Sequence, residues 1–395
     1  MRREEMLQAV HDVLALDAAK STTLGEEVVT LDAARFCDSD LLEQEREALF
    51  LRYPQVVGMG VDLQAGHYST QSVAGVPVIL TRDGDGAFHA FLNACRHRGT
   101  AVAEGCGVAR RLTCPWHAWS YDLRGTLVGV AHAPTFGEID KAVNGLIELP
   151  SVERHGLLFV VPTPGEQFDI DAALADLGPE LAGLNFGSLH RVRERTTDVD
   201  INWKLGNDTG FELYHVAYLH KNSVGPANIG NTALYRQYGF NHRLTALSPA
   251  ARGMVDAPDD QWDPMDYLQF IYNIFPSSGL VVAGQMVALT RLDPGPTPDK
   301  SSFRFTSYSW TPIDQTEARA GAEMLNEFLF NVVVNEDFTT AARTQVNLET
   351  GLLDQLLVGR NELAIANAHA SYDAVLSAGS RLESTFSQSQ YTSRT

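Results

Sequence analysis

The chain has 395 residues, of which 44% are hydrophobic, 9% aromatic and 20% charged. A chain of this length and composition can bury sizeable cores in two or three domains, which excludes disorder as its main state. Its formal net charge is −19, from 30 basic and 49 acidic residues, which argues against binding to nucleic acid or to an anionic membrane. The four cysteines are too few for a disulfide framework and, beside histidines, indicate a metal site.

Two features concern the compartment. No apolar run reaches the roughly 18 to 20 residues that cross a bilayer. The first residues, MRREEMLQAV, contain acidic side chains and lack the apolar stretch of a signal peptide. The sequence therefore predicts a cytoplasmic protein.

Hydrophobic periodicity and turn residues divide the chain into helical and extended stretches. Helices are expected at residues 2–19, 38–50, 171–182, 203–220 and 315–378. Short antiparallel strands are expected between 55 and 162, and longer strands at 190–200 and 240–311. Asp38 or Ser39 is the expected N-cap of the second helix. The order predicts a small β-domain followed by a larger domain that mixes strands and helices.

The first chemical motif lies in the small β-domain, where CRHRG at 95–99 precedes CPWHAW at 114–119. It places Cys95 and His97 on one loop, and Cys114 and His117 on another. In a Rieske [2Fe–2S] centre two thiolates hold one iron and two imidazoles hold the other. The two short pairs therefore predict such a cluster, with a reduction potential raised by the imidazoles.

A structural zinc ion is the alternative, because two cysteines and two histidines also suit tetrahedral zinc. Zinc fingers, however, commonly pair C-x-x-C with H-x-x-x-H, whereas this chain pairs C-x-H with C-x-x-H. A zinc protein is colourless, so a brown protein with a reducible cluster would exclude zinc.

With these two motifs the chain resembles the large subunit of Rieske non-haem iron oxygenases, and the resemblance continues through its second half. It implies an α+β fold: N-terminal helices (1–50) on the catalytic domain, a Rieske antiparallel β-domain (51–165), a helix-grip-like catalytic domain (166–380) and a flexible tail (381–395). It also implies one [2Fe–2S] Rieske cluster and one mononuclear Fe(II) per chain, in a head-to-tail homotrimer. Ala118 is a departure, since the family usually has Gly after the second histidine.

The candidate iron site begins in NWKLGNDTGFELYHVAYLH at 202–220. His215 and His220 are five residues apart, so on a regular α-helix their side chains point about 140° apart. They reach one metal only if the helix is widened or ends between them. The resemblance assigns the third ligand to Asp337, and Ala342 stands where the family usually has Glu. Two histidines and one carboxylate leave a face of Fe(II) open for dioxygen.

Two further acidic residues are candidates for catalytic roles. Glu212 lies three residues before His215, and in the family an acidic residue here links the iron histidine to a Rieske histidine of the neighbouring subunit, the counterpart of His117. That residue is usually Asp, but Glu occurs in members that act on quaternary amines. Asp208 stands where the family commonly has Asn, and we expect it to change the polarity near the iron.

The predicted metal ligands do not identify the substrate. Aromatic residues are dense between 211 and 275 and can line an apolar pocket or a cage for a cation. The acidic segment 256–266 resembles an entrance loop. We predict a terminal oxygenase that activates O2 and hydroxylates a small aromatic or other apolar substrate. The alternatives are N-demethylation or C–N cleavage of a methylated or quaternary amine and, in another class, a Rieske electron-transfer protein.

The electrons must come from another protein, because the chain has no GxGxxG fingerprint for a nicotinamide or flavin cofactor. A ferredoxin and/or a flavin reductase is the expected donor, and a small β-subunit is a further possible partner. No nucleic acid or membrane partner is expected. Arg96, Arg98, Arg110 and Arg111 lie on or between the cluster loops of an acidic protein, and we expect them to help dock an acidic donor.

Overall fold

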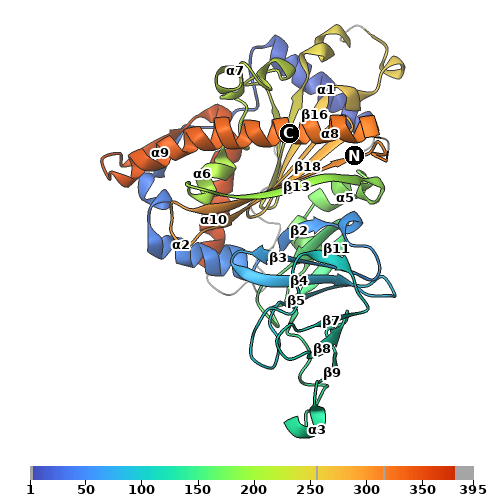
Figure 1. Cartoon of the computed structure of the whole chain (residues 1–395). Coiled ribbons are helices and arrows are strands. Elements are labelled where there is room, and N and C mark those ends of the chain that lie inside the picture. Colours follow the sequence, from blue (N-terminus) through green and yellow to red (C-terminus); the bar gives the residue numbers. More distant parts are fainter. Residues whose placement is uncertain (1–2, 255–256, 315, 379–395) are drawn as a thin grey trace.

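The computed structural model describes residues 3–254, 257–314 and 316–378, and the tail predicted at 381–395 lies outside the described residues. Figure 1 shows a small β-rich part below a larger part that contains most of the helices. All the strand pairs of both parts are antiparallel within the described chain. This architecture confirms the predicted α+β class.

Short strands build the small part as three sheets, with the orders β10-β5-β4-β3-β6, β7-β8-β9 and β11-β12-β2. Its elements are β2 (Gln55–Met59), β3 (His67–Val73), β4 (Val76–Arg82), β5 (Phe88–Leu92), β6 (Cys106–Val108), β7 (Arg111–Thr113), β8 (Ser120–Asp122), β9 (Leu127–Gly129), α3 (Ala133–Phe136), β10 (Glu148–Leu149), β11 (Ser151–Arg154) and β12 (Leu157–Val160). Turn residues with positive φ determine how the paired strands of these hairpins align. Ala74 and Gly75 join β3 to β4 with φ of 50° and 87°, as a two-residue hairpin requires.

A seven-stranded sheet forms the centre of the larger part, with the order β13-β19-β18-β17-β16-β15-β14. Its strands are β13 (His190–Val199), β14 (Leu234–Tyr238), β15 (Asn241–Leu247), β16 (Leu268–Ile274), β17 (Ser278–Ala283), β18 (Met286–Pro294) and β19 (Ser301–Ser309). Strands β14 to β19 pair in sequence order, and β13 closes the edge beside β19. Of these strands, the sequence analysis missed only β14.

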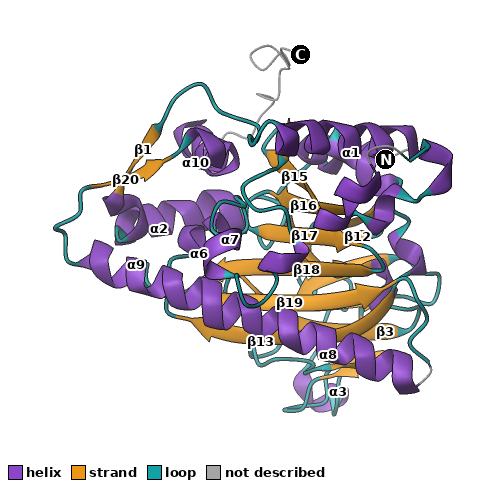
Figure 2. Cartoon of the chain, turned by 90° about the horizontal axis from the view of Figure 1, so that it is seen from above, coloured by secondary structure: helices purple, strands orange, loops and turns teal. Residues whose placement is uncertain are grey.

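The helices cover this sheet on both faces. They are α1 (Arg3–Ala18), α2 (Ser39–Glu45), α4 (Ile170–Leu174), α5 (Leu177–Ala182), α6 (Trp203–Asp208), α7 (Val216–Leu219), α8 (Thr316–Val332), α9 (Thr339–Glu349) and α10 (Leu363–Ala378). Asp38 caps α2 as predicted, because its carboxylate accepts the backbone N–H groups of Asp40 and Leu41 at 2.7 and 3.1 Å. Figure 2 shows α8 and α9 as a nearly continuous rod, in which α8 runs along the edge of the sheet formed by β13 and β19 and α9 extends beyond it beside α6.

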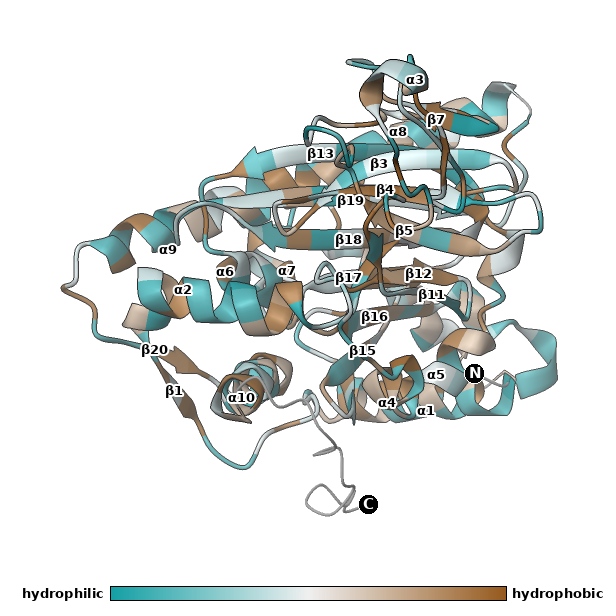
Figure 3. Ribbon diagram, turned by 90° about the horizontal axis from the view of Figure 1, so that it is seen from below, coloured by the Kyte–Doolittle hydropathy of each residue, from teal (hydrophilic) through white to brown (hydrophobic). Residues whose placement is uncertain are grey.

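Alternation along the strands gives the sheet two buried faces. One face carries Leu244 and Ala288 and packs in one core with α10; we call it the α10 face. The other carries Phe270 and Leu280 and packs with α1 and with strands of the small part; we call it the α1 face. Helix α10 is largely hydrophobic in Figure 3, because it is buried against β15, α2 and β20.

The stretch 315–378 is not helical throughout, contrary to the prediction. Strand β20 (Gln355–Val358) pairs with β1 (Val29–Asp32) in a two-stranded antiparallel sheet. A run as short as QLLV has too few residues for its period to distinguish a strand from a helix. None of the helices in the described part of the chain is long and apolar enough to span a bilayer.

Candidate metal centres

The four predicted cluster residues lie on two loops of the small part. Cys95 and His97 follow β5, and Cys114 and His117 lie between β7 and β8. Both thiols are buried, with 3% and 2% of their surface exposed. Figure 1 places the β7–β8 hairpin at the end of the molecule away from the large sheet.

A tyrosine fixes one of the sulfurs. The Tyr121 oxygen accepts the backbone N–H of Arg96 at 3.0 Å and lies 3.4 Å from Cys95 Sγ. Because the backbone amide occupies an acceptor position, the hydroxyl proton is free to point to the sulfur. A hydroxyl donor stabilises a thiolate, which is the form that binds a metal.

Aromatic rings hold the two imidazoles close together. The rings of His97 and His117 lie 4.6 Å apart between centroids. Trp119 stacks on His97 at 5.2 Å and Trp116 stacks on His117 at 4.7 Å. His97 Nδ1 is buried without a hydrogen-bond partner among the described residues. A buried ring nitrogen is costly unless something binds it, and a metal bond would satisfy it.

The separation of the ligand atoms favours a cluster over zinc. The ligand atoms of one tetrahedral zinc lie within about 4 Å of one another. Among the described residues, His215, His220 and Asp337 are the only group of at least three whose ligand atoms all lie within 4.8 Å. The cysteines and histidines of the small part do not form such a group, as expected when thiolates and imidazoles hold different irons.

Ala118 occupies a backbone conformation that favours glycine. Its φ is 55°, in the left-handed region, and its N–H donates to the Cys114 carbonyl at 3.0 Å. A side chain here costs roughly 1 kcal/mol relative to a relaxed backbone. The departure from the family pattern at Ala118 is therefore a small strain in the loop that carries two cluster residues.

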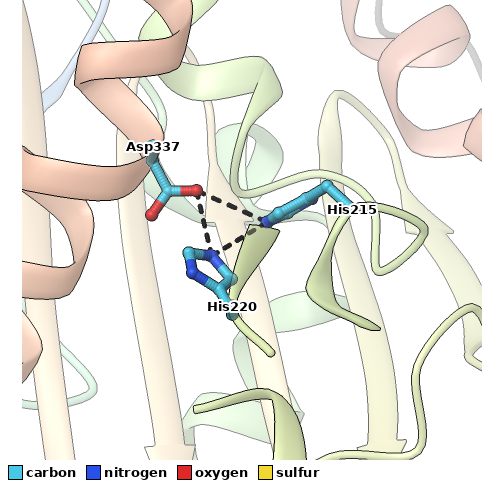
Figure 4. A group of neighbouring side chains, drawn as sticks. All are labelled: His215, His220 and Asp337. Atoms are coloured by element: carbon cyan, nitrogen blue, oxygen red, sulfur yellow. Dashed lines mark hydrogen bonds and ion pairs between the residues drawn. The ribbon is translucent and has the colours of Figure 1, made fainter. Parts of the chain in front are cut away.

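His215, His220 and Asp337 converge in the larger part (Figure 4). The two Nε2 atoms lie 3.2 Å apart, and Asp337 Oδ1 lies 3.1 Å from Nε2 of His220 and 3.4 Å from Nε2 of His215. Asp337 and His220 are buried, and His215 is half-buried. Three convergent atoms on one side of a point form the facial arrangement that Fe(II) takes with two histidines and a carboxylate.

The histidines converge because the predicted helix 203–220 is interrupted. Helix α6 ends at Asp208, and α7 is a single turn that lies between the two histidines, with His215 before its first residue and His220 after its last. The chain then bends tightly, and a Cβ at Gly225 would come within 2.6 Å of the His220 carbonyl oxygen.

The widened helical turn lies at the third residue. Asp337 belongs to the π-helical turn Val333–Phe338 that joins α8 to α9. Such turns commonly occur at functional sites, since one extra residue redirects a side chain. The sequence pattern predicted a widened turn only for the histidine segment.

Two carboxylates orient the imidazoles. Glu212 accepts the Nδ1–H of His215 and, at 3.0 Å, the backbone N–H of the same residue. Glu336 accepts the Nδ1–H of His220 at 2.8 Å and the Ser223 hydroxyl at 2.9 Å. In its neutral form, each ring would therefore keep its proton on Nδ1 and turn an unprotonated Nε2 toward Asp337. Sequence analysis assigned no role to Glu336, although its position beside Asp337 was a usable signal.

Burial lowers the pKa of both histidines, but hydrogen bonds outweigh it. Those with Asp337 and Glu212 raise the pKa of His215 to about 9. Those with Asp337 and Glu336 raise the pKa of His220. Burial opposes ionisation of Asp337, yet hydrogen bonds from the two histidines hold its pKa below the ordinary value. The site therefore attracts positive charge, as a cation site must.

Asp208 contacts a different histidine. Its two carboxylate oxygens each lie 3.2 Å from Nε2 of His369, a buried residue of α10. The pKa of Glu362 is raised mainly by burial and also by the charges of Glu212 and Asp208, so these acidic groups share one electrostatic environment. The structure thus places Asp208 between α6 and α10, outside the group formed by His215, His220 and Asp337.

The aromatic residues predicted near the pocket divide between the faces. The α1-face core contains Tyr238, Trp262, Tyr267, Phe270 and Tyr272, and the α10-face core contains Phe211, Tyr235, Phe240 and Phe275. The ring of Tyr218 is 70% exposed. These aromatic residues therefore cannot all line one substrate pocket, since alternate residues of a strand face opposite sides of the sheet.

The acidic segment lies against the N-terminal helix. The Arg3 guanidinium donates to the Trp262 carbonyl at 2.7 Å, and His11 lies 3.1 Å from Asp259. Next to Glu212, the structure instead has a cavity of about 10 Å³, which Tyr235 and Leu244 also line.

Two family models match the chain. The Rieske [2Fe-2S] domain matches residues 54–146, and the ring hydroxylating alpha subunit (catalytic domain) matches 186–378. The chain belongs to the family of Rieske non-haem iron oxygenase large subunits. These two domains carry a Rieske cluster and a mononuclear iron, which confirms the predicted cofactor set.

The similar proteins include monooxygenases of quaternary amines and, at a TM-score of 0.69 and 16% identity over 88% of this chain and 95% of that one, naphthalene 1,2-dioxygenase. The chain is 30% identical to the carnitine monooxygenase oxygenase subunit of Acinetobacter pittii over 47% of its own length, and 28% identical to chloroplastic choline monooxygenase of Spinacia oleracea over 50%. The alignments cover 51% and 46% of those relatives, so the chain matches about half of each. A solved quaternary ammonium Rieske monooxygenase has the same fold, with a TM-score of 0.76 at 20% identity over 87% of this chain and 94% of that one.

Proposed function

We propose that the chain is the terminal oxygenase component of a monooxygenase that hydroxylates a carbon bound to the nitrogen of a methylated or quaternary amine. Cys95, His97, Cys114 and His117 would hold the [2Fe–2S] cluster, and His215, His220 and Asp337 the mononuclear iron. When bound, the cluster supplies electrons one at a time and the Fe(II) activates dioxygen.

The protein's own side chains prepare the second site. Glu212 and Glu336 keep Nδ1 of each histidine protonated, so that both Nε2 atoms stay free to bind a cation. Asp337 adds a buried negative charge at the convergence point. Phe211 and Leu213 anchor this segment in the apolar core, whereas Tyr214 and Tyr218 are exposed.

The observation that carries the substrate class is Glu212. By resemblance, a Glu at this position occurs in family members that act on quaternary amines; the structure adds that Glu212 and Tyr235 line one small cavity, with room for about one water molecule. The carnitine and choline monooxygenases support the same class. The aromatic substrate expected from the sequence stays a prediction, because neither relative is named for one.

The reaction balances with two electrons and two protons. One oxygen atom enters a C–H bond next to the ammonium nitrogen, and the other leaves as water. The resulting N–CH(OH) group breaks its C–N bond, which releases an aldehyde, a proton and the less substituted amine. A methyl carbon gives formaldehyde.

Electron delivery requires a second subunit and a reductase. Helix α7 and the β7–β8 hairpin lie at opposite ends of the chain in Figure 1. We infer that Glu212 serves the iron of its own chain and the His117 of a neighbour in a homotrimer. A separate ferredoxin or flavin reductase would dock at the four exposed arginines near the cluster, Arg96, Arg98, Arg110 and Arg111.

Product analysis under labelled dioxygen tests the proposal. The holoenzyme, a generic reductase system and NADH are supplied with trimethylammonium compounds or with neutral and acidic aromatics. We expect the less substituted amine and an aldehyde. The aldehyde should carry one oxygen atom from the labelled dioxygen until that atom exchanges with water. The Asp337→Asn variant, with its cluster retained, is the matched control and should give no product. Two labelled atoms in an aromatic product would contradict the amine proposal, and reduction of the cluster with no oxygen chemistry would favour the electron-transfer alternative.

A further inference from the structure

A row of polar side chains crosses the α10 face of the large sheet. Gln237, His242 and Asn273 are register partners on β14, β15 and β16. Direct partners on one face of antiparallel strands have Cβ atoms about 5 Å apart. The neighbouring row on the same face contains Tyr235 and Leu244, so the polar row is one step further along the strands.

This polar row lies next to residues that border Glu212, close to the candidate iron site. On one side of it, Tyr235 and Leu244 line the cavity that contains Glu212. On the other side, Leu292 of β18 lies against α6, where a Cβ at Gly206 would come within 2.7 Å of Leu292 Cδ1. The polar row thus lies between the row that borders Glu212 and the strand position that borders α6.

The hydrogen bonds around His242 define its tautomer. Asn367 Nδ2 donates to the Tyr235 oxygen at 2.8 Å, and that oxygen lies 2.7 Å from His242 Nδ1. Since the Tyr235 oxygen already accepts a hydrogen bond, its proton points to Nδ1, and the neutral ring carries its own proton on Nε2. Burial lowers the pKa of His242 to about 3, so the ring stays neutral near pH 7.

Three polar atoms of this row have no partner within the described chain. They are His242 Nε2 and both amide atoms of Asn273, and the two residues are 2% and 4% exposed. Buried polar atoms are nearly always bonded, so adjacent unpaired atoms need an explanation. The Nε2–H of His242 and the amide N–H of Asn273 can both donate to a hydroxyl or carbonyl oxygen. The Asn273 amide oxygen can in turn accept the proton of a hydroxyl group.

We propose that His242 and Asn273 form a subsite for an uncharged oxygen of the substrate, a hydroxyl or carbonyl on the same molecule as the ammonium group. The inference rests on the proposed function and narrows its substrate class. A carboxylate is a poor fit, because a buried anion needs a cation. Arg243, the basic residue that follows His242 on the strand, points to the opposite face, where it pairs with Glu180.

Equilibrium binding of matched ligands tests this subsite. The holoenzyme is used without an electron donor, so that no turnover occurs. Three trimethylammonium compounds, with a hydroxyethyl, a propyl or a carboxymethyl arm, differ only in the group offered to the row. We expect the hydroxyethyl compound to bind about tenfold more tightly than the propyl compound. Asn273→Leu should remove that preference, and His242→Gln, which keeps an N–H donor near the Nε2 position, should retain part of it.

Thr245→Val is the matched control variant. Thr245 lies on the same strand with a buried, unpartnered hydroxyl, but its side chain is on the α1 face. Its substitution should leave the ratio of the two affinities unchanged. An unchanged ratio in Asn273→Leu, or tighter binding of the carboxymethyl compound, would overturn the subsite.

A stability measurement decides the subsite even if no ammonium compound binds, an outcome that would count against the proposed function. Asn273→Leu should leave the melting temperature of the ligand-free protein unchanged or raise it, because it removes unpaired amide atoms. Asn241→Leu is the control and should lower it, since Asn241 is bonded to Ala173, Tyr238 and Phe275. An equal fall in both variants would show that Asn273 is bonded within the fold, and would overturn the inference.

Discussion

The two metal centres of this chain are built in opposite ways. The cluster residues lie within positions 95–117, on two loops whose shape depends on nearby hydrogen bonds such as those of Tyr121. The iron residues flank α7 and lie in the turn between α8 and α9, and these segments meet only when the large domain is packed. The first centre is thus a local structure, and the second is a product of tertiary folding.

The supporting groups differ as well. Tryptophan rings and a tyrosine hydroxyl surround the cluster residues, whereas carboxylates hold both iron histidines. Thiolates bring their own negative charge, but neutral imidazoles need fixed anions to orient them and to attract a dication. The comparison teaches that each centre can be damaged without the other, and the following experiments test that independence.

Loss of Asp337 should have the largest effect. Asp337→Asn removes the buried charge between the histidines, so product formation should fall by more than about 100-fold, beyond the usual effect of an outer contact. Iron analysis should show two irons per chain in place of three, with the cluster spectrum unchanged. Asp354→Asn, at an exposed position, is the control. A bleached cluster in Asp337→Asn would show that the centres are coupled.

Glu336 should have the next largest effect. Glu336→Gln keeps an acceptor for His220 but removes the charge, and we expect turnover or iron affinity to fall about 10- to 100-fold. Glu212→Gln should behave similarly at His215. Ser223→Ala, which removes only the hydroxyl that donates to Glu336, should cost much less. Equal loss in Ser223→Ala and Glu336→Gln would argue that the charge is unimportant.

Charge reversal at Arg110 and Arg111 should affect reduction of the cluster and leave the iron site unchanged. Arg110→Glu combined with Arg111→Glu should slow reduction of the cluster by an acidic donor about tenfold at low salt. Stopped-flow traces should converge on the wild-type rate at about 1 M salt, where the Debye length is about 3 Å. Arg319→Glu, on α8, is the control for charge reversal away from the cluster, with half the charge change of the double variant. A salt-independent deficit would mean that the pair supports the fold instead of docking.

His242 should give the large domain a sensitivity to acid. Because burial depresses its folded pKa to about 3, protons bind the unfolded chain first as the pH falls below about 6.5. Its contribution to stability is complete above that pH and is lost on acidification, by up to about 1.4 kcal/mol per unit. Unfolding of His242→Gln should depend less on pH between 6.5 and 5. An unchanged slope would place the acid-sensitive group elsewhere.

Ala118 should have the smallest effect, and on the cluster loop alone. Ala118→Gly relieves the left-handed strain but adds freedom to the unfolded chain, so a net gain of at most about 1 kcal/mol is expected. The thermal stability of the cluster absorbance reports it. Val108→Ala, at an exposed site in the same part, is a control. A lower stability in Ala118→Gly would show that the methyl group makes useful contacts.

The sequence alone predicted site residues best where they lie close together in the chain. The spacing of Cys95, His97, Cys114 and His117 determines their chemistry because two hairpin loops bring them together. The separation of His215 and His220 was correctly recognised as incompatible with one regular helix, but the single turn between them depends on bends at Gly210 and Gly225 that have no periodic signal. Assignment of Asp337 needed the family resemblance.

Other features needed tertiary structure. Glu336 acts on His220 from another element, and no spacing rule connects positions 220 and 336. Aromatic density could not separate Tyr235 from Tyr238, although strand alternation sends them to opposite faces. Strand β20 became recognisable only through its partner β1, because a four-residue apolar run fits a helix as well as a strand.

The π-helical turn at Val333–Phe338 makes the large-domain centre sensitive to chain length. A π turn holds one residue more than the α-helix around it. Deleting a single residue there would let α8 and α9 continue as one regular helix, with an intact hydrophobic stripe, while Asp337 rotated by about 100° away from the histidines. A protein of this architecture can therefore lose its second metal through one codon deletion, with its fold and its first cofactor retained.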